Sequence, residues 1–315
     1  MKAAIIRAAG SPPVWASFPD PVPEPGEMLV DVTAVALYNL VCSRASGAHY
    51  STETAFPLAP GVDGVGRLRD GSRVYFVLPR APWGSFAETV AVPSARIVPL
   101  PDDLDDVTAA AIVNPGMSSW AALTERARLA AGETVLVNGA TGTAGRLAVQ
   151  VARHQGAGLV VATGRNAEML ASLGADATVT LTLNVEAMEA AFRAVAEGVD
   201  VVLDFLWGQS ARALLIAAAK ILPEGRRLRF VQIGSVSGGE IALPGAVLRA
   251  AQIELTGSGI GSVPHGRLIG CIRALLLAAH PAGLRIDTDP IPITEVGRVW
   301  AGAGSTRRPV FLLNA

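Results

Sequence analysis

The chain is poor in the residues that build disulfide frameworks and metal clusters. It has only two cysteines among 315 residues, Cys42 and Cys271, and they lie far apart in the sequence. Two distant cysteines give no disulfide framework and fit a reducing compartment, so we predict a cytoplasmic protein. The sequence also lacks three or four metal-ligating residues at the short spacing typical of zinc sites, so no metal is expected.

Charge of one sign and long apolar runs are also scarce. The 26 basic residues nearly balance the 27 acidic ones, the formal net charge is −1, and no basic run occurs. This balance gives no reason to expect nucleic acid or an anionic membrane as a partner. No apolar stretch reaches the roughly 18 residues needed to cross a bilayer, and residues 1–7 lack the apolar core of a signal peptide. Half of the residues are hydrophobic, which predicts a globular protein large enough for two domains.

The most informative stretch is a strand–turn–helix–strand pattern between residues 133 and 165. Residues 134–137 form a short apolar, β-branched run typical of a buried parallel strand, and residues 159–162 form a second one. Apolar residues recur at helical spacing between them. A glycine cluster joins the first strand to this helix, with members three residues apart at Gly139, Gly142 and Gly145.

Small residues at such a turn suit a dinucleotide. They let the backbone turn tightly and approach a pyrophosphate, which then meets the N–H groups and positive end of the following helix. Ala140 occupies the first glycine position of the usual G-x-G-x-x-G pattern. The placement between a strand and a helix still predicts a dinucleotide site. The alternative is a structural βαβ turn that binds nothing.

The residues after the second strand indicate which dinucleotide binds. An NAD site usually has Asp or Glu about 20 residues beyond the glycines, where it binds the ribose 2′-hydroxyl. Here that region reads Gly164, Arg165 and Asn166, and no carboxylate occurs before Glu168. Because arginine pairs well with the oxygens of a 2′-phosphate, we predict NADP(H). The alternative is that Arg165 is a solvated residue at a strand end.

The pattern along the chain changes near residue 102. Before this point the chain is mostly β, with turn signals at short intervals, although residues 12–25 are expected to be irregular. After it, strands alternate with helices, and residues 114–116 are expected to interrupt the first helical region. Six strands are expected, at 134–137, 159–162, 177–181, 201–205, 228–233 and 253–256. This order predicts an α/β fold with a doubly wound parallel sheet of the Rossmann type.

Four motifs resemble those of the medium-chain dehydrogenase/reductase superfamily. They are Pro60-Gly61-Val62-Asp63-Gly64-Val65-Gly66, Gly84-Ser85-Phe86-Ala87-Glu88, Gly116-Met117-Ser118-Ser119-Trp120 and the Ala140-x-Gly142-x-x-Gly145 loop. The resemblance covers essentially the whole chain. It implies an N-terminal GroES-like β domain that binds substrate, made of residues 1–116 together with 258–315. It also implies a Rossmann dinucleotide-binding domain at residues 117–257.

The resemblance points to the zinc-free quinone oxidoreductase branch. Zinc enzymes of the superfamily place a Gly-His-Glu pair and a cysteine on the metal, but here the His position is Val62, and the early ligand falls at Tyr38 or Asn39. The cysteines of their structural zinc lobe are absent. The short length and the Ser46-Gly47-x-x-Tyr50 element resemble the zinc-free branch. This resemblance implies hydride transfer from NADPH to a quinone, an enone or a related conjugated carbonyl compound.

The same resemblance assigns the cofactor residues. Those expected at the pyrophosphate are Gly142, Thr143, Ala144 and Gly145, and those expected at the adenosine phosphate are Gly164, Arg165 and Asn166. The nicotinamide is expected beside Ile233, Gly234, Ser235 and Ser118. Carboxyl ends of parallel strands are where open α/β sheets bind ligands, which supports the residues at strand ends independently.

The substrate-side expectations concern three residues. Tyr38 and Tyr50 are candidates to donate a hydrogen bond to a carbonyl oxygen, and Asn39 to orient it. The alternative for each tyrosine is a core aromatic residue with its hydroxyl already bonded. Residues 37–44 depart from the usual quinone reductase pattern, because its aspartate is missing. A narrower subgroup with its own substrate is therefore compatible with the sequence.

Two other functions and an assembly state remain open at this point. The same cofactor would also serve reduction of a ketone, aldehyde or imine, and the chain could be an NADPH-binding regulator without turnover. The resemblance also implies a homodimer in which the sixth strands of two Rossmann sheets pair. Residues 253–257 would otherwise form an exposed edge strand, which dimerisation removes.

Overall fold

The computed structural model describes residues 1–49, 55–300 and 307–313. The chain divides into two compact units, one made of Met1–Asn114 with Ile272–Ala315 and the other of Pro115–Cys271. The functional domains expected from the sequence, with boundaries after residues 116 and 257, stay a prediction. No helix in the described part of the chain is long and apolar enough to cross a membrane.

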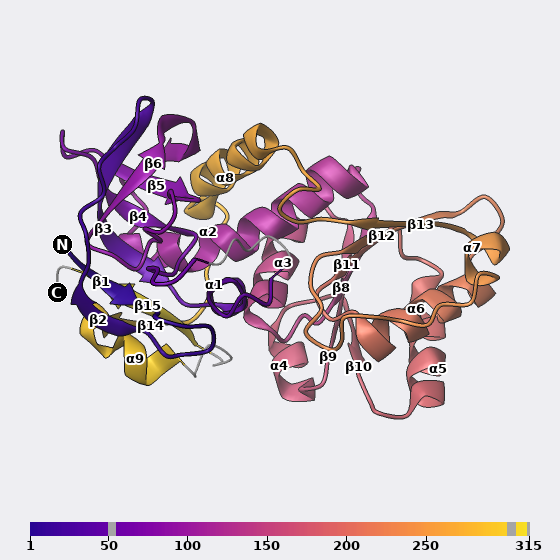
Figure 1. Ribbon diagram of the computed structural model, residues 1–315. Coiled ribbons are helices and arrows are strands. Elements are labelled where there is room, and N and C mark those ends of the chain that lie inside the picture. Colours follow the sequence, from indigo (N-terminus) through magenta and orange to yellow (C-terminus); the bar gives the residue numbers. More distant parts are fainter. Residues whose placement is uncertain (50–54, 301–306, 314–315) are drawn as a thin grey trace. The chain divides into compact units, whose positions relative to one another are not determined.

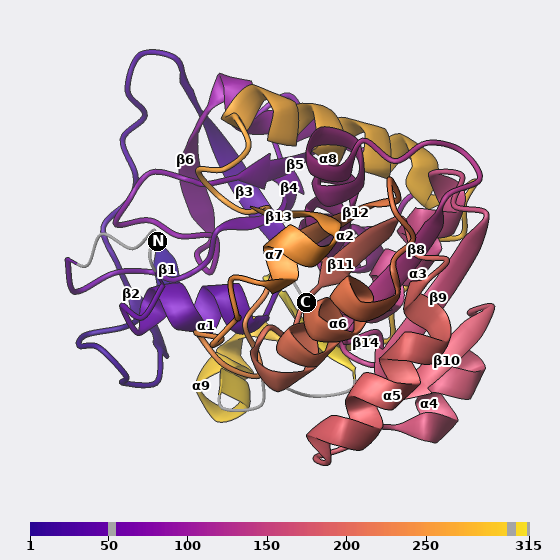
Figure 2. The same ribbon diagram turned by 90° about the vertical axis from the view of Figure 1, so that its right-hand side faces the viewer.

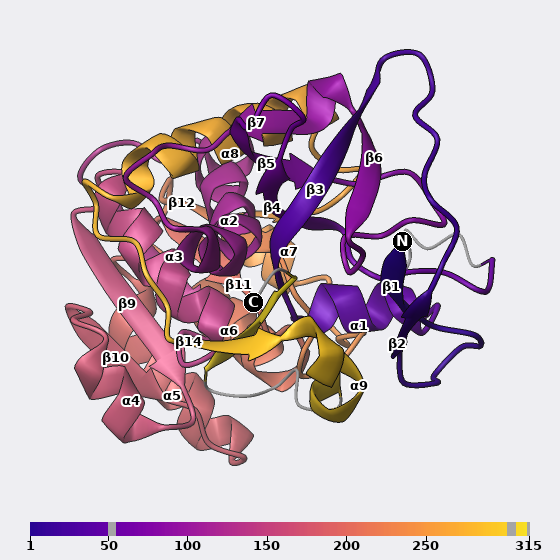
Figure 3. The same ribbon diagram turned by 90° about the vertical axis from the view of Figure 1, so that its left-hand side faces the viewer.

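The first unit is built on a seven-stranded sheet. Its strands run in the order β14-β15-β3-β4-β5-β7, and β6 pairs with β3 beside this path. The strands are β3 (Glu27–Ala36), β4 (Asp63–Arg67), β5 (Arg73–Val77), β6 (Thr89–Pro93), β7 (Ile97–Pro99), β14 (Thr288–Pro292) and β15 (Arg308–Leu312). Figure 3 shows the long strand β3 beside β6. The last strand of the chain therefore joins a sheet that the N-terminal segment begins.

Smaller elements complete this unit. A two-stranded sheet joins β1 (Lys2–Ile5) to β2 (Val14–Ser17). Strand β2 lies inside the segment expected to be irregular, so that expectation was wrong there; four residues of β1 pair with it in antiparallel register. The short helical elements are α1 (Asn39–Ala45), η1 (Ser94–Arg96), η3 (Ile293–Glu295) and α9 (Val296–Val299).

The second unit contains a six-stranded sheet in which every pair is parallel. The spatial order is β10-β9-β8-β11-β12-β13, so the strand order reverses between β8 and β11 (Figure 1). The strands are β8 (Thr134–Asn138), β9 (Leu159–Gly164), β10 (Ala177–Thr180), β11 (Val201–Asp204), β12 (Arg227–Gln232) and β13 (Gln252–Gly257). The prediction of a doubly wound sheet with six parallel strands is confirmed.

Helices alternate with these strands. They are α3 (Thr143–His154), α4 (Ala167–Ser172), α5 (Val185–Ala196), α6 (Gly208–Ile221) and α7 (Val247–Ala250). Figure 2 looks onto the side of the sheet where α5, α6 and α7 lie. The core on this side joins Phe192 of α5 and Leu214 of α6 to Phe230 of β12, all fully buried. Burial of each such side chain stabilises the fold by roughly 1.5–3 kcal/mol.

Two helices pass the residues at which the two units divide. These are α2 (Asp106–Ala121), which continues into a π-helical turn, η2 (Ala122–Ala127), and α8 (His265–Ala279). The expected interruption at residues 114–116 was wrong, because α2 runs through Pro115. Proline removes one helix hydrogen bond. The apolar residues just before it, such as Ile112 and Val113, are fully buried, and this burial outweighs the local propensity.

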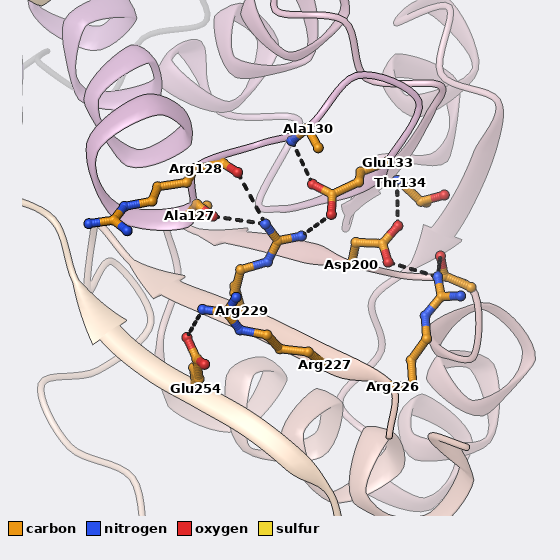
Figure 4. Close-up of polar contacts among 11 residues, drawn as sticks. Ala127, Arg128, Ala130, Glu133, Thr134, Asp200, Arg226, Arg227, Arg229 and Glu254 are labelled. Carbon is orange, nitrogen blue, oxygen red and sulfur yellow. Dashed lines mark hydrogen bonds and ion pairs between the residues drawn. The ribbon is translucent and has the colours of Figure 1, made fainter. Parts of the chain in front are cut away.

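Charged side chains join the loops at the amino ends of the strands in the second unit (Figure 4). Arg229 is buried, and its guanidinium Nη1 donates to the carbonyl oxygen of Ala127 at 2.8 Å while Nη2 donates to Glu133 at 2.5 Å. A more exposed pair, Arg227 and Glu254, links β12 to β13. The contact of Glu133 lies at the amino end of β8, and the glycine cluster follows the carboxyl end of the same strand.

Candidate functional site

The glycine cluster connects β8 to α3 and is shaped by close backbone packing. Gly139 is buried and has a φ of +94°, which L side chains rarely adopt. A Cβ atom on Gly145 would lie 2.2 Å from the carbonyl oxygen of Gly139, whereas one on Gly142 would lie 3.5 Å from it. Gly145 is therefore needed for the helix to approach the turn, as the sequence pattern indicates.

The turn leaves the amino end of α3 open. Gly142 is the N-cap, and in the described structure no side chain caps the first N–H groups of this 12-residue helix. Gly142 is exposed, while Thr143 and Ala144 are half-buried. Uncapped N–H groups and the positive end of the helix dipole favour an anion at this position.

A fully buried polar network lies directly behind the glycine turn. Asn138, the last residue of β8, donates from Nδ2 to Asp204 at 2.7 Å and to Ser210 Oγ at 3.0 Å. Its Oδ1 accepts from Thr163 Oγ1 at 2.7 Å. Thr163 Oγ1 in turn accepts from the N–H of Gly139 at 3.2 Å, and the Thr163 carbonyl oxygen accepts from Ala140 at 2.7 Å. The turn is thus held from β9 and, through Asn138, from β11.

Asp204 connects this network to two further loops. Its carboxylate accepts from the N–H groups of Leu206 and Trp207, each at 3.1 Å. Its backbone carbonyl accepts from Ile233 at 2.7 Å and from Gly234 at 3.1 Å. Burial raises the pKa of Asp204 to about 6, against the opposing effect of the hydrogen bond from Asn138 and those from the backbone. One residue therefore anchors the loops that follow β11 and β12.

The remaining cofactor-side residues lie in different environments. Gly164 is buried, and a Cβ atom there would lie 2.4 Å from Thr141 Cγ2. Arg165 is exposed at the end of β9, and Asn166 uses its side-chain oxygen to cap α4 through Met169 N at 2.9 Å.

Two serines complete this set. Ser235 is exposed. Ser118 is half-buried in α2 and donates its hydroxyl proton to the Pro115 carbonyl oxygen at 2.7 Å. Its side chain is thus already engaged within its own helix.

The substrate-side residues belong to the first unit. Tyr38, the N-cap residue of α1, is only 5% exposed, and its hydroxyl donates to the carboxylate of Asp63. Burial and then the Asp63 charge raise the pKa of Tyr38 well above its usual value. Asn39 is exposed, and Tyr50 lies outside the described residues. Tyr38 therefore has the environment that the alternative interpretation described, a buried tyrosine whose hydroxyl is bonded.

Asp63 is the centre of this second network. It is 4% exposed and accepts hydrogen bonds from the hydroxyls of Tyr38 and Tyr75 and from the side chain of Asn114. The guanidinium carbon of Arg308 lies 5.4 Å from the centre of the Tyr38 ring. Burial raises the pKa of Asp63 to about 6, although the three hydrogen bonds and Arg308 act in the opposite direction.

Sequence reasoning missed the residues that organise both networks. Asp63 lies within the motif at residues 60–66. Asn138 and Asp204 are the last residues of two parallel strands, where open α/β sheets bind ligands. Their position at the strand ends was the signal that could have identified them. In the described part of the chain, no group of three or more His, Cys, Asp or Glu side chains is placed to hold a metal ion.

A family match and a similar full-length relative both indicate a dehydrogenase or reductase family. Residues 144–275 match the family described as zinc-binding dehydrogenase. A probable NADPH-dependent quinone reductase of Emericella nidulans is 32% identical over 348 residues, which cover 95% of this chain and 96% of the relative.

Solved structures are similar over the whole chain. The quinone oxidoreductase of Thermus thermophilus, which was also solved with NADPH, has a TM-score of 0.81 at 28% identity, with 99% of this chain and 100% of that chain covered. A mycobacterial quinone oxidoreductase has a TM-score of 0.84 at 22% identity with the same coverage, and this second likeness concerns the fold alone.

Two substitutions test the packing of the glycine turn. We expect Gly145→Ala to lower the free energy of unfolding by about 1–3 kcal/mol, because its Cβ would overlap the Gly139 backbone. Gly142→Ala is the matched control and should change it by no more than about 0.5 kcal/mol. Urea denaturation measures both. Equal effects of the two substitutions would contradict the packing described here.

The pH dependence of stability tests the burial of Asp63. Its folded pKa of about 6 exceeds the ordinary 3.8, so the stabilisation from a protonated Asp63 is present below pH 4 and is lost as the pH rises through 6. We expect the stability of the wild type relative to Asp63→Asn to fall by roughly 3 kcal/mol across this window. Denaturant unfolding at several pH values measures this difference. Asp102→Asn, at an exposed position, is the control. A stability difference between the wild type and Asp63→Asn that stays constant from pH 4 to 6 would exclude the shift.

Proposed function

Because the chain belongs to the medium-chain dehydrogenase/reductase superfamily, in its quinone oxidoreductase-like branch, we propose that it reduces conjugated carbonyl compounds with NADPH and without zinc. The substrates proposed are quinones, enones or related compounds. The family follows from a relative matched over nearly the full length of both chains. We assign the first unit to the GroES-like part of this superfamily and the second unit to the Rossmann part.

The observation that carries the proposal is the open amino end of α3 above the glycine turn. Small residues and uncapped N–H groups fit a pyrophosphate, so Gly142, Thr143, Ala144 and Gly145 would hold it. NADP(H) is the cofactor that fits, because the relative's name specifies NADPH and no carboxylate stands at the end of β9. The exposed Arg165 would pair with the 2′-phosphate, beside Gly164 and Asn166.

The other cofactor contacts follow from the strand ends. Ile233, Gly234 and Ser235 would line the nicotinamide, together with Ser118. The backbone of the first two is already fixed by the carbonyl oxygen of Asp204. Bound NADPH supplies the hydride, and the protein positions the acceptor carbon and binds the carbonyl oxygen.

Tyr38, Asn39 and Tyr50 are the proposed substrate-side residues. The Tyr38 hydroxyl donates to Asp63, so Tyr38 would act on a substrate by exchanging that bond. Asn39, exposed at the start of α1, would orient the carbonyl group.

The zinc-free mechanism rests on residue types. The side chain of Val62 has no atom that ligates a metal, and the nearby Asp63 carboxylate is engaged by two tyrosine hydroxyls. Zinc in proteins needs three or four nitrogen, sulfur or oxygen ligands.

An NADPH-oxidation assay tests the proposed function. We expect turnover of quinones or enones that prefers NADPH to NADH and is insensitive to a chelator. Arg165→Ala should lose about 10- to 150-fold in NADPH affinity and little in NADH affinity, since a charge-assisted hydrogen bond contributes about 1.5–3 kcal/mol. Arg193→Ala, on helix α5, is the control.

Other outcomes of this assay select other functions. Ketones, aldehydes or imines as the best substrates would replace the proposed substrate class. Inhibition by the chelator would contradict the zinc-free mechanism. NADPH binding without any turnover across the panel would indicate an NADPH-binding regulator instead of an enzyme.

We also propose a homodimer formed by pairing of two β13 strands. In the described structure β13 pairs only with β12, and Leu255 on it is 36% exposed. Light scattering should give twice the chain mass of 32.4 kDa. Leu255→Arg should shift the protein towards the monomer, whereas Leu248→Arg, on the neighbouring helix α7, should not. A monomeric wild type would exclude this assembly.

A further inference from the structure

In the buried network behind the glycine turn, each hydrogen bond has a fixed donor and a fixed acceptor. The Asp204 carboxylate, when ionised, only accepts hydrogen bonds. The Nδ2 atom of Asn138 therefore has to face it, at the observed 2.7 Å. This choice leaves the Asn138 Oδ1 atom on the other side, where it can only accept. The orientation of one amide is thus set by one carboxylate.

The orientation of the Asn138 amide in turn sets the orientation of the Thr163 hydroxyl group. Because Asn138 Oδ1 accepts, the hydroxyl of Thr163 donates its single proton there, at 2.7 Å. The lone pairs of the same oxygen remain available for a donor, and the N–H of Gly139 fills this role at 3.2 Å. The chain of hydrogen bonds ends on the first residue of the glycine turn. A reversed amide at position 138 would turn the hydroxyl proton away from its acceptor.

Thr163 holds two successive residues of the turn. Its hydroxyl accepts from Gly139 and its carbonyl oxygen accepts from Ala140. The carbonyl oxygen of Gly139 in turn accepts from Gly142 at 3.1 Å and lies where a side chain on Gly145 would collide. The position of the α3 amino end is thus fixed through Gly139. All of these contacts are made within the chain.

We propose that Thr163, oriented through Asn138 by the Asp204 carboxylate, is a positioning residue that preorganises the pyrophosphate cradle. Its side chain is fully buried, so it acts through the turn. This inference rests on the proposed binding of NADPH. Because the turn is already ordered, binding of the pyrophosphate does not require the free energy that ordering it would cost. The affinity for NADPH is higher by this amount.

A pair of substitutions at Thr163 tests this role. Thr163→Val keeps the shape and removes the hydroxyl, so the buried Gly139 N–H loses its acceptor. Thr163→Ser keeps the hydroxyl. We expect Val to weaken NADPH binding by about five- to tenfold or more, and Ser to retain nearly wild-type affinity. Titration calorimetry with NADPH measures both, and hydrogen exchange of the cofactor-free protein should show faster exchange at residues 139–142 for Val only.

A second pair tests the direction of the network. Asp204→Asn keeps an Oδ1 atom that can still accept from Asn138, Leu206 and Trp207, so we expect it to retain most of the NADPH affinity. Asp204→Leu has a similar volume but removes every acceptor at this position, so the Asn138 amide loses the group that orients it and we expect weaker NADPH binding. Equal NADPH affinities of the two variants would contradict the orienting role of residue 204.

Glu133→Gln is the matched control for lost stability. It weakens the partly buried contact to Arg229 at the other end of β8 (Figure 4), so it should lower the unfolding temperature without changing the Kd for NADPH. Wild-type affinity and wild-type exchange at residues 139–142 in Thr163→Val would overturn the inference. Failure of the wild type to bind NADPH would instead refute the proposed function, and the exchange data would still decide whether Thr163 positions the turn.

Discussion

The carboxylate of Asp204 is the constraint on which the carboxyl edge of the parallel sheet depends. A charge in the protein interior is tolerated only when its lone pairs are satisfied. Here the donors come from Asn138 at the end of β8 and from the backbone after β11. The carbonyl group of the same residue binds the chain after β12. These loops are therefore fixed together, and a change in one of them leaves a buried polar group in another unpaired.

The first unit also contains a buried carboxylate, that of Asp63, but different groups donate hydrogen bonds to it. Asp63 is also buried and also has a pKa raised to about 6, but its donors are the hydroxyls of Tyr38 and Tyr75 and the amide of Asn114. Side chains from separate elements, rather than backbone groups, satisfy this carboxylate. Such an arrangement rigidly places α1 relative to the strands of its own sheet. In both units a costly buried charge defines the local geometry.

Much of the fold could be predicted because its signals are local. Alternation of apolar runs placed all six parallel strands within two residues of their observed bounds, and the glycine spacing located the turn before α3. The role of Asp63 could not be predicted in this way, because its contact with Tyr75 depends on the register of β4 and β5. The continuous course of α2 through Pro115 depends likewise on burial, which is a tertiary property. Local patterns thus predicted the glycine turn before α3. The contacts of Asn138, Thr163 and Asp204 that hold this turn became visible only in the folded structure.

The strand order of the first unit has a consequence for synthesis of the chain. Strand β15 lies between β14 and β3, so this sheet joins residues from both ends of the sequence. The second unit is continuous, from Pro115 to Cys271. On the ribosome, all strands of the second unit emerge before β15, and domains generally fold as units in the order of synthesis. The segment of β3 that pairs with β15, residues 34–36, therefore lacks this partner until residues 308–312 have been synthesised. The first unit is thus the later of the two to be completed and the more exposed to wrong strand pairing.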